Sequence, residues 1–321
     1  MMTARATSAS EDIELARLPL LTRDDARALA TLIAGLLTTA LLPARFDPWI
    51  AGILAQSWLR LRPGAVKRLA EKMKDRLGVE AGYCDFVEMA RQHYLMRFET
   101  GWGRIRGMHG AGWSPDVTIE GLQKVTQGLS AGRGVILWRM AFCSGPAVMH
   151  ACRRAGLPLV HLSRAGHGST RLSRLGLRTV CKLWQRAENQ RLEERVVIPV
   201  DGSLEYVQVL LDRLAANRVL SIVGEHAGKG NVTARLLGVD REFATGAPAL
   251  AWELGATLVT LYAVREGPCR YRVVIDPPIC MDRGLDRRMA ICKAVEEYAH
   301  RLEQRIVEHP AEWRGWGTRL I

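Results

Sequence analysis

The sequence predicts an α/β fold, in which a mainly parallel sheet has helices on both faces and is preceded by apolar helices near the N-terminus. Three observations lead to this prediction. The chain of 321 residues is 48% hydrophobic and 24% charged, as is ordinary for a globular protein with a sizeable core. Short β-branched runs alternate with helical stretches through its C-terminal part. Two strongly apolar helical segments come before them.

The strands are predicted from apolar, β-branched runs, and the helices from apolar residues spaced three and four apart. The expected strands are "GVILWR", "LPLVHLS", "ERVVIPV", "RVLSIVG", "ATLVTLYAV" and "YRVVIDP". The helical stretches between and after them lie near residues 146–155, 169–190, 203–216, 246–255 and 285–308. Such alternation is typical of parallel strands joined by crossover helices, which then cover both faces of the sheet.

The N-terminal part divides into a polar segment and apolar helices. Residues 1–27 are polar, mixed in charge and expected to be loose. Residues 28–62 are expected to form apolar helices, but the uncharged run 28–42 is shorter than the roughly 20 residues that span a bilayer. An in-plane membrane anchor and a pair of helices packed on the core remain alternatives. Residues 63–321 are expected to form a single α/β domain, because no repeat or low-complexity tract marks a second one.

The net charge of +12 narrows the classes of partner. Arginine supplies most of it, because lysine occurs at only seven positions. Guanidinium groups suit phosphates and carboxylates, so the candidate partners are anionic lipid at a membrane surface, an acidic carrier protein, or nucleic acid. The basic run "HLSRAGHGSTRLSRLGLR" lacks the interleaved aromatic residues of a base-stacking surface, which makes nucleic acid the least favoured partner. A merely solvated basic surface is the remaining alternative.

The seven cysteines are scattered, and no two of them form a C-x-x-C pair. This spacing indicates neither a zinc site nor a disulfide framework, and reduced thiols in a cytosolic setting fit best. We therefore expect neither a metal nor a cofactor.

The stretch "GVILWRMAFCSG", residues 134–145, is where a catalytic loop is expected. Its predicted strand ends at Arg139, and the catalytic side chains of α/β enzymes project just beyond the carboxyl ends of parallel strands. The loop that follows contains Cys143 and Ser144 but no histidine and no carboxylate. The site is therefore expected to be altered here or to lie elsewhere.

Four stretches occur in a recognisable order: "VTIEGLQKVTQGLSAGRGVILWRMAFCSG", "LPLVHLSRAGHGSTRLSRLGLR", "RVLSIVGEHAGKGNVTARLLGVDREFATGAPALAWELGATLVTLY" and "RIVEHPAEWRGWGTRL". Together they resemble the bacterial lipid A biosynthesis acyltransferase family, also called the lysophospholipid acyltransferase-like family, over about residues 47 to 321. The first stretch is similar to the family's segment that leads into its catalytic loop. The third is similar to its run of an acidic residue, FFG and TGP, and the fourth stands where members have Pro-Glu-x-Trp.

The resemblance implies a glycerolipid acyltransferase-like fold on the cytoplasmic face of the bacterial inner membrane. Such enzymes move an acyl group from acyl carrier protein, or from acyl-CoA, to a lipid or related acceptor. The family uses a His-x4-acid motif, in which histidine takes the acceptor's proton and the carboxylate orients the imidazole. Met140 and Gly145 stand at those two positions here. No histidine in the chain has an acid five positions further on, so the motif is missing from the whole sequence.

Other residues are candidates for a rebuilt site. Cys143 is a candidate nucleophile, because a thiol can accept an acyl group as a thioester when a base lowers its pKa. Glu225 occupies the family's acidic position after a strand, and the candidate bases are the adjacent His226 together with His150 and His161. The residues expected to bind substrate are Arg139, Ser144, Arg164 and Lys229.

Three functions stay open at this point, and the least favoured, a basic nucleic-acid-binding protein, rests on charge alone. The favoured one is an acyltransferase with a non-standard active site, acting on a hydroxyl or amine acceptor. The alternative is a catalytically inactive homologue that binds acyl carrier protein or lipid as the partner of an active enzyme.

Overall fold

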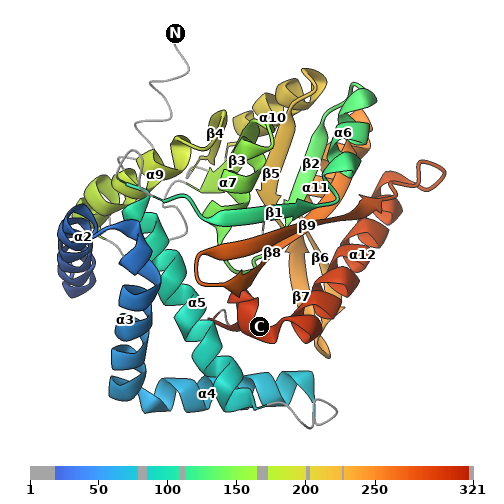
Figure 1. The fold of residues 1–321 in the computed structure, drawn as a ribbon. Helices are drawn as coiled ribbons and strands as arrows, with labels where there is room; N and C mark the ends of the chain where they lie inside the picture. Colours follow the sequence, from blue (N-terminus) through green and yellow to red (C-terminus); the bar gives the residue numbers. More distant parts are fainter. Residues whose placement is uncertain are drawn as a thin grey trace.

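A seven-stranded sheet forms the centre of the computed structural model, which describes residues 19–78, 85–108, 113–164, 173–199, 203–225 and 228–317 (Figure 1). The strand order is β1-β9-β8-β2-β5-β3-β4. The strands are β1 (Asp116–Glu120), β2 (Val135–Arg139), β3 (Leu159–Arg164), β4 (Glu194–Ile198), β5 (Val219–Val223), β8 (Thr257–Gly267) and β9 (Arg270–Ile279). All neighbouring strands are parallel except β8 and β9. The predicted α/β class and mainly parallel sheet are therefore confirmed.

Strand β2 lies between β5 and β8, with neighbours on both sides, and all five of its residues are buried. This central position explains why its sequence is almost continuously apolar, because a strand covered on both faces has no solvent side. Ile136 and Trp138 enter the core on one face of the sheet, and Val135 and Leu137 enter the core on the other. The strand is thus a rigid support for the loop that follows Arg139.

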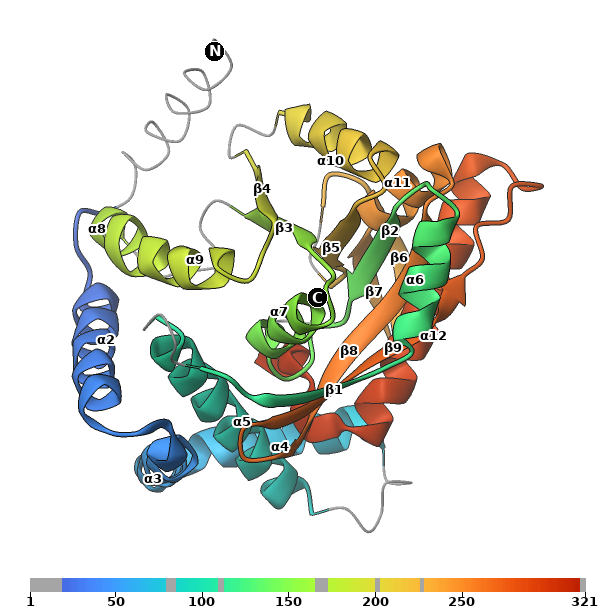
Figure 2. The same cartoon turned by 45° about the horizontal axis from the view of Figure 1, so that its top comes forward.

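Helices cover both faces of the sheet (Figure 2). Helices α10 (Glu205–Ala215), α11 (Gly246–Leu254) and α12 (Arg287–Glu308) contribute to the core that contains Trp138, whose ring stacks on that of Tyr298 at 4.1 Å between centroids. Helices α6 (Leu122–Ser130) and α7 (Gly145–Arg154) contribute to the opposite core. The stretch expected to be helical near residues 169–190 contains α8 (Arg174–Gly176), a π-helical turn (Leu177–Cys181) and α9 (Lys182–Asn189), and its residues 169–172 lie outside the described part.

Three strands are present that the sequence did not predict: β1, β6 (Asn231–Leu236) and β7 (Val239–Ala244). β6 and β7 form a separate antiparallel hairpin. Its two turn residues, Leu237 and Gly238, have φ angles of 50° and 75°, as a tight turn that matches the strand twist requires. Exposed and half-buried residues alternate along β1, and charged residues interrupt β7, so neither forms an apolar run.

Among the described residues, four α-helices precede the sheet: α2 (Arg23–Leu41), α3 (Asp47–Leu61), α4 (Pro63–Leu77) and α5 (Phe86–Arg106) (Figure 1). Helix α2 begins earlier than the expected residue 28, because Thr22 and Asp25 form a capping box before it. Residues 1–18 of the segment expected to be loose lie outside the described part. Within the described residues, no helix has both the length and the apolar character needed to span a membrane.

A buried ion pair joins α3 to α5. Trp102 donates to Asp47 Oδ1 over 2.8 Å, and Arg106 donates to the same carboxylate through Nη2 at 2.6 Å and Nε at 2.8 Å. Helix α2 also packs on α5, where a Cβ atom on Gly35 would approach Ile105 Cδ1 to 2.8 Å. Outside α5, Asp25 on α2 accepts from the Ser173 amide at 2.9 Å, and Lys72 on α4 donates to the Trp316 carbonyl at 2.7 Å. The N-terminal helices are therefore attached to the rest of the molecule through α5 and through these two bonds.

Candidate active site

The loop after β2 is held by the C-terminal segment of the chain. Phe142 forms an isolated antiparallel bridge with Trp313. The amide of Cys143 donates to the Glu312 carbonyl at 2.8 Å, and the amide of Arg314 donates to the Ala141 carbonyl at 2.8 Å. The C-terminal segment contains two short 3-10 turns, Pro310–Glu312 and Arg314–Gly317. The bonds above therefore place this segment against the expected catalytic loop.

Glu225, just beyond β5, joins this loop to the C-terminal segment. Its Oε1 accepts from the Ala141 amide at 2.5 Å, and its Oε2 accepts from Trp313 Nε1 at 2.7 Å. Burial raises the pKa of Glu225, while the charge of Arg241 and these two hydrogen bonds act in the opposite direction. Both carboxylate oxygens are therefore engaged in positioning the loop, and proton transfer at Glu225 would require one of these bonds to break.

Cys143 lies at the centre of the loop in a strained conformation. Its φ angle is 33°, which is uncommon for a residue with a side chain, and such strain gathers at functional sites. The residue is fully buried and packs in a small cluster with Met96, Trp113, Ala147 and Tyr271. Burial raises the pKa of the Cys143 thiol well above its usual range, and the nearby Glu312 carboxylate adds to the effect. The thiol is therefore neutral at rest, and it needs a base in order to react.

Glu312 is a candidate site residue that the sequence analysis missed. Its carboxyl group lies close enough to the Cys143 side chain to affect the pKa of the thiol, and its Oε2 atom is buried without a hydrogen-bond partner in the structure. Burial raises the pKa of Glu312 to about 7, although Cys143 and the charge of Arg265 act against this. Arg265 Nη2 in turn donates to Glu99 on α5 at 2.7 Å. A carboxyl group with this pKa can accept and return a proton near neutral pH.

The histidines considered as bases are less suited to this role. His226 lies outside the described residues. His161 donates through Nδ1 to the Ser221 carbonyl at 3.0 Å, and burial, helped by Arg139, lowers its pKa to about 3. Burial also lowers the pKa of His150, whose ring contacts Trp113. Among the described histidines, none forms a hydrogen bond with Cys143.

The residues expected to bind substrate fall into two groups. Arg139 and Ser144 lie beside Cys143 at the carboxyl end of β2, and both are buried. Ser144 caps helix α7, since its Oγ accepts from the Ala147 amide at 3.3 Å. Arg164 is exposed at the end of β3, separated from β2 by β5, and Lys229 is exposed before β6. Arg139 and Ser144 are thus brought together with the candidate catalytic residues.

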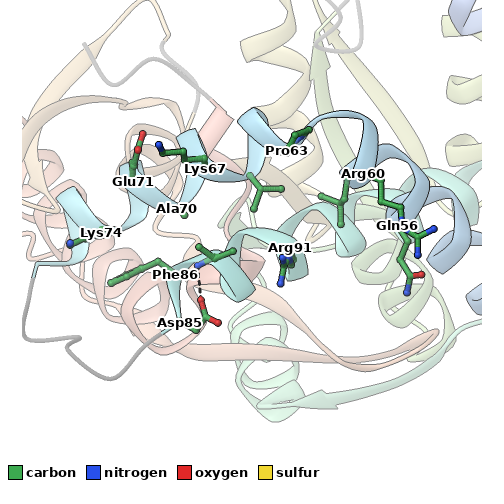
Figure 3. A pocket seen from close by; sticks show the side chains of 13 residues that line it. Gln56, Arg60, Pro63, Lys67, Ala70, Glu71, Lys74, Asp85, Phe86 and Arg91 are labelled. Atoms are coloured by element: carbon green, nitrogen blue, oxygen red, sulfur yellow. Dashed lines mark hydrogen bonds between the residues drawn. The ribbon is translucent and has the colours of Figure 1, made fainter.

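A separate cleft of about 850 Å³ lies among α3, α4 and the start of α5 (Figure 3). It has apolar lining residues such as Leu59, Val66 and Phe86. Basic side chains accompany them, namely Arg60, Lys67, Lys74 and Arg91, together with the carboxylates Glu71 and Asp85. None of the predicted site residues lines this cleft. Within the described residues, no group of three or more His, Cys, Asp or Glu side chains could hold a metal ion.

The family model of the bacterial lipid A biosynthesis acyltransferases matches the chain over residues 80–316. The chain belongs to this family. The resemblance found in the sequence is thereby confirmed. The general activity of this family is acyl transfer. Among solved structures, the crystal structure of a 1-acyl-sn-glycerophosphate acyltransferase from Thermotoga maritima matches the chain at 12% sequence identity and a TM-score of 0.39, covering 83% of this chain and 99% of that one. A search of curated proteins finds no match.

The sequence near the C-terminus contains a signal that points to Glu312. The family's Pro-Glu-x-Trp ending becomes Pro310-Ala311-Glu312-Trp313 here, so that the acid stands one position later. In the structure this later position is the one whose backbone and side chain both meet Cys143. The loop that approaches it, residues 140–144, contains no histidine and no carboxylate.

Proposed function

We propose that the protein transfers an acyl group from acyl carrier protein or acyl-CoA to a hydroxyl or amine of a lipid or related acceptor, using Cys143 as nucleophile and Glu312 as general base. The observation that supports this proposal best is the contact between the Cys143 thiol and the buried Glu312 carboxyl group at the carboxyl end of β2. This end of a central parallel strand is where α/β enzymes place their chemistry.

The proposed reaction has two steps. Cys143 Sγ attacks the thioester carbonyl of the donor while its proton moves to the Glu312 carboxylate, and the donor thiol then leaves with that proton. A thioester now joins the acyl group to Cys143. In the second step Glu312 takes the proton of the acceptor hydroxyl or amine, whose oxygen or nitrogen attacks the thioester, and the proton returns to the Cys143 sulfur.

Charge and shape support a carrier protein as donor. The cleft of α3, α4 and α5 has an apolar lining and four basic side chains, Arg60, Lys67, Lys74 and Arg91, against two carboxylates, Glu71 and Asp85 (Figure 3). An acidic carrier protein that presents an acyl chain is complementary to such a surface. Replacing Lys67 and Lys74 together by glutamate should raise KM for acyl carrier protein and leave KM for acyl-CoA almost unchanged.

The enzyme proposal is tested by incubating the protein with acyl-CoA or acyl carrier protein and measuring its intact mass. The wild-type protein should gain one acyl group, which Cys143→Ala should abolish and Glu312→Gln should slow. Cys152→Ala is the matched control, because Cys152 is another buried cysteine, on α7. Transfer to a lipid acceptor that persists in both Cys143→Ala and Glu312→Gln would refute the assignment of these residues.

A catalytically inactive binding protein is the second candidate function. The complete burial of Cys143 and the engagement of both Glu225 oxygens favour it, because neither group is free to react in the resting structure. In that case acyl carrier protein or lipid would bind, but no acyl group would appear on the protein or on an acceptor. Binding without transfer for either donor would select this function over the first.

We further propose that α2 and α3 attach the protein to the cytoplasmic face of the bacterial inner membrane, with anionic lipid as the partner. Leu29, Ile33, Leu37 and Leu41 form an exposed stripe at four-residue spacing along α2, from 40% to 80% exposed. Trp49 on the neighbouring α3 is 66% exposed. An exposed apolar stripe on a helix is typical of in-plane membrane binding.

Sedimentation with vesicles that contain anionic phospholipid tests this attachment. Ile33→Asp combined with Leu37→Asp should abolish most of the binding without unfolding the protein, because both side chains are exposed. Val307→Asp is the control, because Val307 is an equally exposed apolar residue on α12. Equal loss of binding in both variants would contradict a specific role for α2.

A further inference from the structure

The guanidinium of Arg139 is buried without a hydrogen-bonding partner for two of its nitrogens. Arg139 is the last residue of β2 and is 6% exposed. Its Nε and Nη1 atoms are buried and form no hydrogen bond in the structure. Its carbonyl accepts from the Gly224 amide at 2.9 Å and from Tyr298 at 3.1 Å, so the backbone is fixed. A buried, ionised and unpaired guanidinium is strongly unfavourable, and such groups are normally paired with an anion.

The guanidinium lies directly over the start of helix α7. A Cβ atom on Gly145, the first residue of that helix, would come within 2.8 Å of Arg139 Nη2. The N-terminus of this ten-residue helix carries the positive end of the helix dipole, although the Ala147 and Val148 amides already donate to Ser144 and Pro146 has no N–H. Two positive groups are therefore held together at one place, and both would be stabilised by the same anion.

Neighbouring arginines increase this excess of positive charge. Burial lowers the pKa of Arg139, and the charge of Arg104 on α5 contributes to the shift. Arg104 has a buried Nε without a hydrogen-bond partner. The nearby carboxylate, Glu188 on α9, already accepts from Arg195 Nη2 at 2.9 Å and lies 3.9 Å from Arg104 Nη2. The Glu188 carboxylate is thus shared between the guanidiniums of Arg195 and Arg104.

Arg314 reaches the same region from the C-terminal segment. Its amide donates to the Ala141 carbonyl at 2.8 Å, which fixes its backbone on the loop after β2. The residue is exposed, so it is not one of the buried arginines. Arg139 and Arg104 come from β2 and α5, and the fold therefore assembles them from distant parts of the sequence.

We propose that Arg139, with Arg104 near it, binds the phosphate group of a ligand at the N-terminus of helix α7. A phosphate has several charged oxygens that can each accept from a different guanidinium, whereas a carboxylate offers two oxygens in one plane. The phosphate could be free or could belong to the headgroup of a lipid or to coenzyme A. This proposal is independent of the acyl transfer proposed above, because an inactive protein would bind the same group.

Isothermal titration calorimetry with inorganic phosphate, coenzyme A and a short-chain lysophosphatidic acid tests the proposal, with the matching monoacylglycerol as the ligand that lacks phosphate. Arg139→Met should weaken the binding of every phosphate-containing ligand that the wild type binds, by roughly 10- to 100-fold. Arg287→Met is the control, because Arg287 is exposed on α12 and pairs with Glu253. Inorganic phosphate that binds as tightly as the other two ligands identifies free phosphate, and tighter lysophosphatidic acid or coenzyme A identifies that source.

Stability without ligand gives a second measurement. Because Arg139→Met removes an unpaired buried charge and keeps a long apolar side chain, its Tm in phosphate-free buffer should equal or exceed that of the wild type. Phosphate should then raise the Tm of the wild type but not of the variant. Equal affinities in the two proteins, no binding of any of the three ligands, or a much lower Tm of the variant without ligand would overturn the proposal.

Discussion

Replacing Glu312 by glutamine should change how the stability of the protein depends on pH. Burial raises the pKa of this carboxyl group from 4.5 to about 7, so the folded protein holds its proton more tightly than the unfolded chain does. Glutamine has nearly the same shape, but it does not titrate. The substitution therefore removes the ionisation of this one side chain while the packing around it is retained.

The sign and the size of the effect follow from the two pKa values. A carboxyl group whose pKa is higher in the folded state stabilises the fold fully below pH 4.5, and this stabilisation is lost as the pH rises through about 7. A shift of this size corresponds to about 3 kcal/mol of unfolding free energy. Wild-type protein should therefore lose up to about 3 kcal/mol more than Glu312→Gln between pH 4.5 and pH 8.

Urea denaturation of both proteins at several pH values measures this difference. All other titrating groups are shared, so their contributions cancel when the two pH profiles are subtracted. Glu296→Gln, at an exposed carboxyl group on α12, is the control and should give a profile parallel to that of the wild type. If the profile of Glu312→Gln were also parallel to that of the wild type, the raised pKa would be wrong, and with it the argument for Glu312 as a base near neutral pH.

Three further predictions concern the packing that positions the site. Asp47→Ala should lower the unfolding free energy by about 3–5 kcal/mol in urea denaturation, because it leaves Arg106 buried without its carboxylate. Glu225→Ala should lower it by at least about 2 kcal/mol, because two buried N–H groups lose their acceptor, and tryptophan fluorescence should change with it. Gly35→Ala should lower the Tm because its Cβ meets α5, whereas Gly52→Ala, with open space around it, should raise the unfolding free energy by about 0.5–1 kcal/mol.

The strands that could be predicted from the sequence are those that form continuous apolar runs. β2 is such a case, because all five of its residues are buried and its apolar sequence alone is enough to predict it. β6 and β7 were not predictable in this way. Their residues include exposed and charged side chains, and they pair through a tight turn rather than by burial on both faces. An interrupted pattern of this kind is stable as a hairpin only because α12 lies against it.

The site was predictable in part for the same physical reason. Cys143 and Ser144 follow a recognisable strand, so their place at its carboxyl end was evident from local sequence. The contact between Cys143 and Glu312 depends on how a distant segment returns to the loop, and periodicity gives no information about such a return. The direction of the Arg139 side chain was equally hidden, because it depends on the lack of a side chain at Gly145.

Arg139 and Gly145 depend on each other, and this dependence connects the two proposals. The guanidinium can lie over the start of α7 only because residue 145 has no Cβ, which would stand 2.8 Å from Nη2. The buried guanidinium has two nitrogens without a hydrogen-bond partner, so it carries a positive charge that an anionic ligand can neutralise. A phosphate bound there would lie at one end of the loop whose centre is Cys143, so the ligand that neutralises Arg139 would be held next to the thiol and to Glu312.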